Sequence, residues 1–286
     1  MENNNKCFFC SPVRNVGRYL ERIFSNIEKL GSAFSDFYVC FFYDESKDNT
    51  LEKLMILKNK YPNKIKIIIN DEPLLKYRTH RIANARNTLV QYARKNFSDY
   101  EYIIMLCGDE INCYNIDLDV LKYHLKLNTW DCLSFNRTGL PHGHENYDIW
   151  ALLYEPFIHH CHSYNGCLDI VYAMRDDITK KLNNLKKGEL FEVYSAYNGL
   201  CIYRADKFKN CKFDGEKQKY FSDKRINNML EYLRKTYNKN LTINFDFVDS
   251  SHGGGKQIAE LINFNIEGIR KNNARIRISG EKLFVR

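Results

Sequence analysis

Apolar runs alternate with amphipathic stretches along the first part of the chain. Four short, largely apolar runs predict strands, at residues 6–13, 37–43, 64–70 and 100–106. The run at 37–43 is fully apolar and predicts a buried central strand. Three intervening stretches carry apolar side chains at helical spacing and predict helices, at residues 15–34, 44–61 and 79–97. This alternation predicts a doubly wound α/β fold with a mostly parallel sheet and right-handed crossovers.

The pattern is less regular in the second half. Helical periodicity returns at residues 119–127 and 223–238, and strand-like runs occur at 130–137 and 241–251. A further segment, 191–204, predicts two short strands separated by a Tyr-Asn-Gly break.

A long stretch, residues 137–170, is rich in glycine, histidine and aromatic residues and has little regular signal. Stretches of this kind are more often functional than idle. No repeat or linker divides the chain, so we expect a single domain that spans residues 1–286.

Polar side chains follow three of the predicted strands directly. The strand ends read "SPVRN", "YDESKDN" and "CGDE". In doubly wound sheets, ligands bind beyond the carboxyl ends of the strands. These three segments are therefore the first candidates for a binding site.

Composition narrows the class of protein. Hydrophobic residues make up 44% and aromatic residues 14% of the 286 residues, which is typical of a folded chain and excludes a disordered one. No apolar run approaches the roughly 18–20 residues of a membrane span, and the first ten residues lack the order of a signal peptide. We therefore expect a cytoplasmic protein whose ten cysteines are reduced and mostly buried.

The formal net charge of +8 indicates a basic surface. Such a surface suits nucleic acid, anionic lipid or a phosphorylated small molecule, although it is equally typical of a soluble protein with no charged partner. The densest clusters are Lys186–Lys187 and residues 270–286. No nucleic-acid-binding motif accompanies them, so we expect no nucleic-acid partner.

Three segments carry a resemblance to a known family. "SPVRNVGRYL" and "FFYDESKDNTLEKL" match a first and a second strand with their turns, and "RIANARNTLVQYARKNFSDYEYIIMLCGDE" joins an Ala-Arg-Asn helix to an apolar strand that ends in acids. Together they resemble the GT-A glycosyltransferases, which use nucleotide-diphosphate sugars. "YDIWALLYEPF" and "SAYNGLCIYR" are similar to segments of capsule mannosyltransferase-like enzymes.

This resemblance covers roughly residues 10–205. It implies a GT-A (Rossmann-like) α/β fold with a doubly wound mixed sheet. It also implies a nucleotide-sugar-binding half at about 1–135 and an acceptor-binding half at about 136–286 within one domain.

A divalent cation, Mn²⁺ or Mg²⁺, is the cofactor that the resemblance implies, held by an Asp-x-Asp motif after the fourth strand. A cation there would stabilise the negative charge that gathers on the leaving diphosphate. The aligned triplet is Cys107-Gly108-Asp109, so the first Asp of the motif is missing. The resemblance implies metal contact by Asp109, with help from Glu110 and a further ligand in His252. Alternatively, Asp109 and Glu110 are an exposed acid pair that caps the next turn.

Donor binding is expected at the three strand ends and at the helix before the acidic strand. An acid after the second strand binds the base or ribose in this fold, although "DESKD" is also a good helix start. The planar guanidinium of Arg86 suits the diphosphate or orders the acidic loop, unless it lies on a solvated helix face. The donor-binding candidates are Pro12, Val13, Arg14, Asp44, Glu45, Arg81, Arg86, Asn87, Cys107, Gly108 and Asp109.

Acceptor binding is expected in the irregular stretch, where Tyr147, Asp148 and Trp150 could pack on a sugar ring and bind its hydroxyls. Trp150 could equally belong to the core. An inverting transferase also needs a carboxylate base, and Glu192 is the candidate. The stereochemical course, inverting or retaining, stays open.

The leading hypothesis is a metal-assisted glycosyltransferase that moves a sugar from a UDP- or GDP-linked donor to a hydroxyl of a glycan or glycoconjugate. One alternative is a sugar-nucleotide nucleotidyltransferase, although "SPVRNVG" lacks the Gly-rich loop of that class. Another is a non-catalytic carbohydrate-binding protein with a decayed site, which Cys107 would suit.

Overall fold

The computed structural model describes residues 5–137, 148–164, 167–216, 218–243 and 259–285. Within these ranges one mixed sheet has the strand order β3-β2-β1-β4-β8-β6-β9-β5, and β7 pairs with β9. The strands are β1 (Lys6–Val13), β2 (Asp36–Tyr43), β3 (Ile65–Ile69), β4 (Tyr102–Leu106), β5 (Asn115–Ile116), β6 (Cys132–Arg137), β7 (Leu190–Glu192), β8 (Leu200–Arg204) and β9 (Ile276–Val285). The helices are α1 (Leu20–Gly31), α2 (Thr50–Lys60), α3 (Arg78–Asn96), α4 (Leu118–Leu125), α5 (Cys167–Asn183), α6 (Asp223–Tyr237) and α7 (Glu260–Asn272).

The amino-terminal half is the parallel part of the sheet. β1 pairs in parallel with β2 and β4, and β2 pairs in parallel with β3. Beyond β4 the direction changes, because β8 runs antiparallel to both β4 and β6. The predicted doubly wound mixed sheet is therefore confirmed.

Helices cover both faces of the sheet. Apolar side chains of α1, α2 and α4 join one buried cluster, whereas those of α3, α5 and α7 join the other. The central strand β1 serves both clusters: Cys7 lies in one and Cys10 in the other, because successive side chains of a strand point to opposite faces. This arrangement separates the two thiols of "CFFC", as their spacing predicts.

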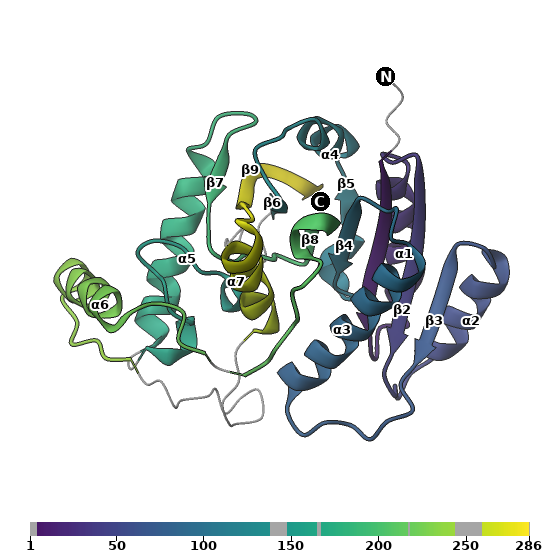
Figure 1. Ribbon diagram of the computed structural model, residues 1–286, viewed down its shortest axis with the longest axis horizontal. Helices are drawn as coiled ribbons and strands as arrows, with labels where there is room; N and C mark the ends of the chain where they lie inside the picture. The colour runs from purple at the N-terminus through teal and green to yellow at the C-terminus, as the bar shows by residue number, and fades with distance from the viewer. Residues whose placement is uncertain (1–4, 138–147, 165–166, 217, 244–258, 286) are drawn as a thin grey trace.

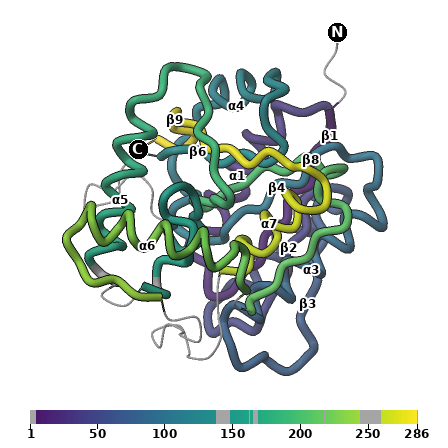
Figure 2. The backbone as a smooth tube through the Cα atoms, turned by 60° about the vertical axis from the view of Figure 1, so that its left-hand side comes forward, coloured from purple at the N-terminus to yellow at the C-terminus, as the bar shows by residue number. Residues whose placement is uncertain are grey.

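Figures 1 and 2 both show β3 at one side of the molecule and α5 and α6 at the opposite side.

The sequence pattern did not predict α5, α7 or β9. The strand predicted at residues 241–251 lies mostly outside the described residues. Across the described ranges, no helix has both the length and the apolar character needed to cross a membrane.

Candidate functional site

A cavity of about 340 Å³ lies beyond the carboxyl ends of β1, β2 and β4. It is lined by Pro12, Val13, Arg14, Val16, Phe42, Asp44, Arg78, Arg81, Ile82, Ala85, Arg86, Cys107, Gly108 and Asp109. Nine of the eleven donor-binding candidates thus meet around one space, although their sequence positions span almost 100 residues. The two outside the lining are Glu45 and Asn87.

The loops after β1 and β2 are joined by hydrogen bonds between backbone N–H groups and polar side chains. The Gly17 N–H donates to an Asp48 carboxylate oxygen (2.9 Å), and the Val16 N–H donates to the Thr50 hydroxyl (2.9 Å). A Cβ at Gly17 would lie 2.1 Å from Asn49 Oδ1 and 3.1 Å from the Thr50 nitrogen, so a larger residue there would displace the Asn49 side chain. The residues of "DESKDNT" therefore order the cavity wall, which is the turn role left open above.

At the end of β2 the two predicted acids take different positions. Asp44 lines the cavity and accepts a hydrogen bond from the Asn70 side-chain amide (2.9 Å). Glu45 is exposed, and its carbonyl oxygen accepts from Arg14 Nε (3.0 Å). Of the two carboxylates, Asp44 is the one that can meet a ligand in the cavity.

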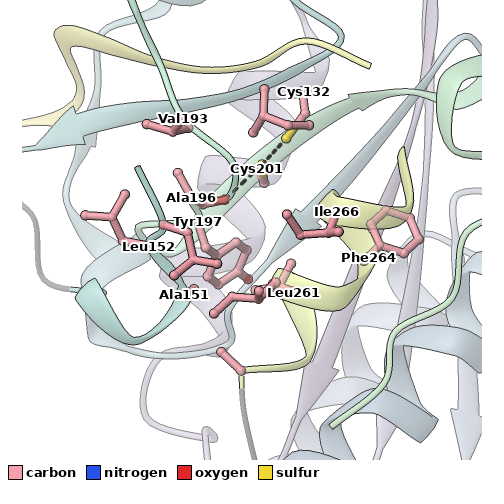
Figure 3. Packing of buried hydrophobic residues seen from close by; sticks show 14 of the residues in the cluster. Cys132, Ala151, Leu152, Val193, Ala196, Tyr197, Cys201, Leu261, Phe264 and Ile266 are labelled. Atoms are coloured by element: carbon pink, nitrogen blue, oxygen red, sulfur yellow. Dashed lines mark hydrogen bonds between the residues drawn. The ribbon is translucent and has the colours of Figure 1, made fainter. Parts of the chain in front are cut away.

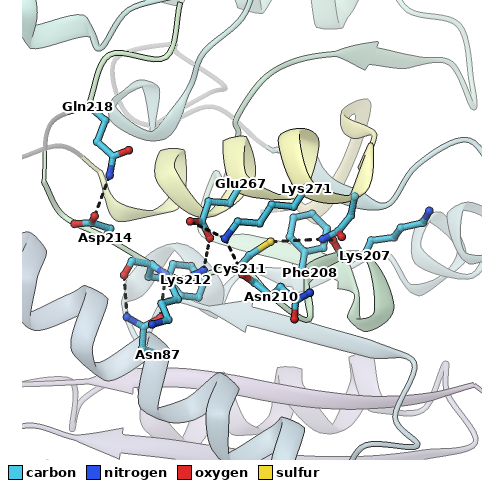
Figure 4. A network of polar contacts seen from close by, with 12 residues as sticks. Asn87, Lys207, Phe208, Asn210, Cys211, Lys212, Asp214, Gln218, Glu267 and Lys271 are labelled. Atoms are coloured by element: carbon cyan, nitrogen blue, oxygen red, sulfur yellow. Dashed lines mark hydrogen bonds and ion pairs between the residues drawn. The ribbon is translucent and has the colours of Figure 1, made fainter.

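The first turns of α3 form one wall. Arg78, Arg81 and Ala85 are three and four residues apart, so they share one helix face. Asn87 lies on another face. Its side-chain amide donates to the Phe213 carbonyl (2.8 Å) and accepts from the Phe213 N–H (2.9 Å), as Figure 4 shows. Asn87 therefore holds the backbone segment around Phe213, which lies between α3 and α7 in space, and does not line the cavity.

Arg86 lies deeper and forms an ion pair with Glu260, the first residue of α7. Both residues are 4% exposed. The Arg86 guanidinium also lies 4.8 Å from the centre of the Tyr197 ring. Burial alone would lower the pKa of Arg86, but the nearby Glu260 carboxylate raises it above its ordinary value, so Arg86 stays charged.

Cys107 differs chemically from the aspartate it replaces. Burial raises the pKa of the Cys107 thiol to about 12, and the charge of Asp109 acts in the same direction. The thiol therefore stays protonated near neutral pH. Mg²⁺ and Mn²⁺ prefer charged oxygen ligands, so Cys107 is unsuited to the role of the missing acid.

Asp109 follows at the mouth of the cavity. Its side chain is open to solvent on one side, while surrounding protein desolvates it and raises its pKa; Arg137, Arg78 and Arg86 oppose this rise. The preceding residue, Gly108, packs tightly, since a Cβ there would lie 2.9 Å from a Val13 methyl group. This tight packing brings the acidic loop against the end of β1.

Glu110 does not line the cavity. It is exposed and accepts a hydrogen bond from the Tyr19 hydroxyl (3.3 Å). The other predicted metal ligand, His252, lies outside the described residues. In the part of the chain that the structure describes, no group of three His, Cys, Asp or Glu side chains could hold a metal ion. The described donor set therefore does not fit a metal site built by the protein alone.

The acceptor-side candidates lie near α3 and α7. Burial raises the pKa of Asp148 to about 6, and its carboxylate accepts from the Ala151 N–H (3.3 Å). The positive charges of Arg86 and Arg78 oppose this rise, and Asp148 itself does not line the cavity. The Trp150 ring is partly buried against the core and lies 5.6 Å from the Arg78 guanidinium. Tyr147 lies outside the described residues.

Helix α7 supports the backbone beside Asp148. The Asn265 side-chain amide donates to the Ser195 hydroxyl (3.0 Å), which donates to the Ala151 carbonyl (2.7 Å). Apolar residues of the same helix pack around Tyr197, as Figure 3 shows. Since Glu260 of α7 also holds Arg86, one helix anchors both sides of the cavity.

Glu192 lies elsewhere. It is exposed at the end of β7 and pairs with Arg277 on β9 (3.2 Å), and it does not line the cavity. A catalytic role for Glu192 has no support from this placement.

A larger cavity, about 650 Å³, lies at the opposite edge of the parallel sheet. Its lining includes residues just before β1 and β4, such as Asn5, Tyr100 and Glu101. Ligands of doubly wound sheets bind at the carboxyl edge, so the smaller cavity is the candidate site.

Two charged residues at the site, Arg78 in the lining and Glu260 beside Arg86, were absent from the candidates drawn from the sequence. Arg78 could have been found, because it is three residues before Arg81 on one helix face. Glu260 could not, since it begins a helix that the sequence pattern did not predict.

No family model matches the chain, and no curated protein matches it. Among solved structures, S. aureus TarS is 14% identical over 98% of this chain and 36% of that chain, with a TM-score of 0.50. TarS 1–349 in complex with UDP-GlcNAc is 13% identical over 99% of this chain and 58% of that chain (TM-score 0.49). The mannosyltransferase PcManGT from Pyrobaculum calidifontis, in complex with GDP-Man and Mn²⁺, is 13% identical over 73% and 47% (TM-score 0.43).

The chain thus spans 36% to 60% of the length of the TarS structures it matches. At such low identity the likeness shows the fold and nothing further. The strand order and the likeness to TarS together give this chain the α/β fold of the GT-A glycosyltransferases.

Proposed function

We propose that the chain transfers a sugar from a nucleotide-diphosphate donor, UDP- or GDP-linked, to a hydroxyl of a glycan or glycoconjugate. The observation that carries the proposal is the cavity at the carboxyl edge of β1, β2 and β4. It combines one acid after β2 with guanidinium groups from α3 and an acid after β4. In the proposed binding mode, the acid after β2 binds the nucleoside, the guanidinium groups bind the diphosphate, and the acid after β4 faces the sugar.

Transfer breaks the bond between the sugar carbon and the diphosphate oxygen, and the diphosphate leaves with the electron pair. Cationic groups beside the diphosphate stabilise the charge that develops there. The acceptor oxygen forms the new bond and loses its proton. Among the predicted acceptor-binding residues, Asp148 is the one with a carboxylate; it does not itself line the cavity, but its neighbour Trp150 lies 5.6 Å from Arg78 of the lining. The pKa of about 6 leaves Asp148 mostly ionised at neutral pH and ready to accept the proton of an acceptor hydroxyl.

A divalent cation, Mn²⁺ or Mg²⁺, stays a prediction. Of the three predicted metal ligands, only Asp109 lines the cavity among the described residues. One carboxylate can hold such a cation only together with phosphate oxygens and water. The proposed chemistry is therefore written without a step that passes through a metal.

A donor screen tests the proposal. The purified chain would be incubated with UDP- and GDP-sugars, with and without Mn²⁺, while nucleotide release and thermal stabilisation are followed. We expect at least one donor to stabilise the fold and to release its nucleotide. If no donor does either, the proposed transfer is wrong.

Cys107 favours a second candidate, a carbohydrate-binding protein that has lost catalysis. Such a protein would be stabilised by a glycan but would release no nucleotide from any donor. A nucleotidyltransferase would instead form pyrophosphate from a nucleoside triphosphate and a sugar phosphate. Both assays belong in the same screen, since each gives a result that sugar transfer does not.

A further inference from the structure

We propose that three arginines, Arg14, Arg78 and Arg81, bind the diphosphate of the donor directly, so that nucleotide binding needs no divalent cation. The proposal rests on the function proposed above and departs from the metal-held diphosphate that the sequence predicts. It concerns the wall of the cavity formed by the loop after β1 and the start of α3.

Cations outnumber acids in the lining of this cavity. Four arginines line it, against the carboxylates of Asp44 and Asp109. Arg86 is already neutralised by Glu260. A diphosphate would supply the negative charge that the remaining three arginines lack.

The three arginines have polar contacts but no acidic partner. Arg14 donates to the Glu45 carbonyl, and Arg81 donates to the Leu75 (2.6 Å) and Lys76 (3.1 Å) carbonyls. Arg78 lies over the Trp150 ring. In the described ranges, no carboxylate lies within ion-pairing distance of any of the three.

Their mutual repulsion also favours an anionic ligand. Burial lowers the pKa of Arg81, and the positive charges of Arg14 and Arg78 lower it further, although the carboxylate of Asp44 opposes them. Gathering like charges around a cavity costs free energy. An anionic ligand between them would reverse this cost.

The helix on which two of them lie favours the same ligand. α3 has 19 residues and begins at Arg78, and the side chain of the preceding Tyr77 makes no capping hydrogen bond. The amino terminus of a long helix attracts phosphate through its backbone N–H groups and the helix dipole. Arginine adds a planar fork that can hold two phosphate oxygens at once.

The wall of the cavity after β4 provides fewer ligands for a metal ion than the family motif does. Cys107 has a thiol where the motif has a carboxylate, and Glu110 bonds to Tyr19 outside the cavity. Asp109 is then free to bind sugar hydroxyls, as a carboxylate at this position could do without a metal. The arginines on one wall and the loss of acidic ligands on the other both favour binding of the diphosphate without a divalent cation.

Titration calorimetry on the full chain tests this proposal. Pyrophosphate, GDP and UDP would each be titrated in EDTA and again with Mn²⁺. We expect pyrophosphate and one nucleotide to bind in EDTA, with Kd values within about threefold of those in Mn²⁺. Arg78→Met and Arg81→Met should each weaken binding at least about tenfold, the loss expected when a charge-assisted hydrogen bond is removed.

Arg270→Met is the matched control, because Arg270 is exposed, donates to the Tyr220 carbonyl and lies outside the cavity. It should leave every Kd unchanged. Arg78 is itself exposed, so its replacement should leave the fold intact even if that of Arg81 does not.

The outcomes separate the two proposals. Binding that requires Mn²⁺, or unchanged binding by both arginine variants, would overturn the arginine proposal and leave sugar transfer standing. Pyrophosphate binding in EDTA without binding of either nucleotide would support the arginines and contradict the proposed function. If none of the three binds in either condition, both proposals are wrong.

Discussion

Replacing Glu260 by Gln is expected to lower the free energy of unfolding by about 3–5 kcal/mol, the usual cost of leaving one charge of a buried ion pair without its partner. Glutamine keeps the shape of the side chain and removes only its charge. Arg86 is 4% exposed and its pKa is raised, so it cannot escape to solvent or lose its proton. The Tyr197 ring, 4.8 Å from the guanidinium, remains as a partner and favours the lower end of this range.

Urea unfolding at equilibrium measures the change in the free energy of unfolding. An m value that is the same in the variant and the original protein checks that unfolding stays two-state. The matched control is Glu231→Gln, which removes the same charge from an exposed pair with Lys235 on α6. That variant should lose less than about 0.5 kcal/mol. Replacing both Arg86 and Glu260 by apolar residues should recover much of the loss. The reasoning is refuted if Glu260→Gln is as stable as the control variant.

Three further predictions concern the cavity and its surroundings. Because Asp148 has a pKa raised to about 6 and acts in its ionised form, kcat/KM should fall as the pH drops through about 6; a profile that stays flat there would contradict this role. Gly17→Ala should cost roughly 1–2 kcal/mol in urea unfolding, since the new Cβ would lie 2.1 Å from Asn49 Oδ1 and force that side chain away; unchanged stability would mean that the two loops adjust freely. Asp109→Ala should abolish sugar transfer without unfolding the protein, whereas Glu110→Ala should retain most of it, because only Asp109 lines the cavity; equal losses would show that the acids act as a pair.

The parallel half of the fold could be predicted because its signals are local. β1, β2 and β4 are short apolar runs that are mostly buried, β3 is an apolar run at the edge of the sheet, and α1 has a clear apolar face. The break in "SAYNGLCIYR" was also visible, and Asn198 and Gly199 both have positive φ.

The second half could not be predicted in the same way. β9 lies between β6 and β7, and its residues Arg277, Ile278 and Ser279 pair with both strands, but the basic segment 270–286 that contains it suggested only a charged surface. The first turns of α7 are buried although they contain Glu260, Asn263 and Asn265, and polar residues at buried positions obscure the helical pattern in the sequence. Tertiary contacts, rather than local pattern, stabilise these elements.

For the site, the rule that ligands bind beyond the carboxyl ends of parallel strands was sufficient to identify most of the candidates that line the cavity. Asn87 was misleading because it adjoins Arg86 in sequence, although neighbouring helix residues point in directions about 100° apart. Glu192 was chosen for its chemistry alone, and the sequence does not reveal that β7 pairs with β9, away from the cavity. The position of an acid within the sheet decides whether it can act at the cavity. A single sequence does not reveal this position for β7.

The central claim is that the cavity at the carboxyl edge binds the nucleotide diphosphate of a sugar donor. A crystal structure of the chain with GDP or UDP tests it most directly. The account predicts that the base or ribose lies near Asp44 and that the diphosphate lies against Arg78 and Arg81, facing Asp109. A nucleotide bound instead in the larger cavity beside Tyr100, at the opposite edge of the sheet, would contradict it.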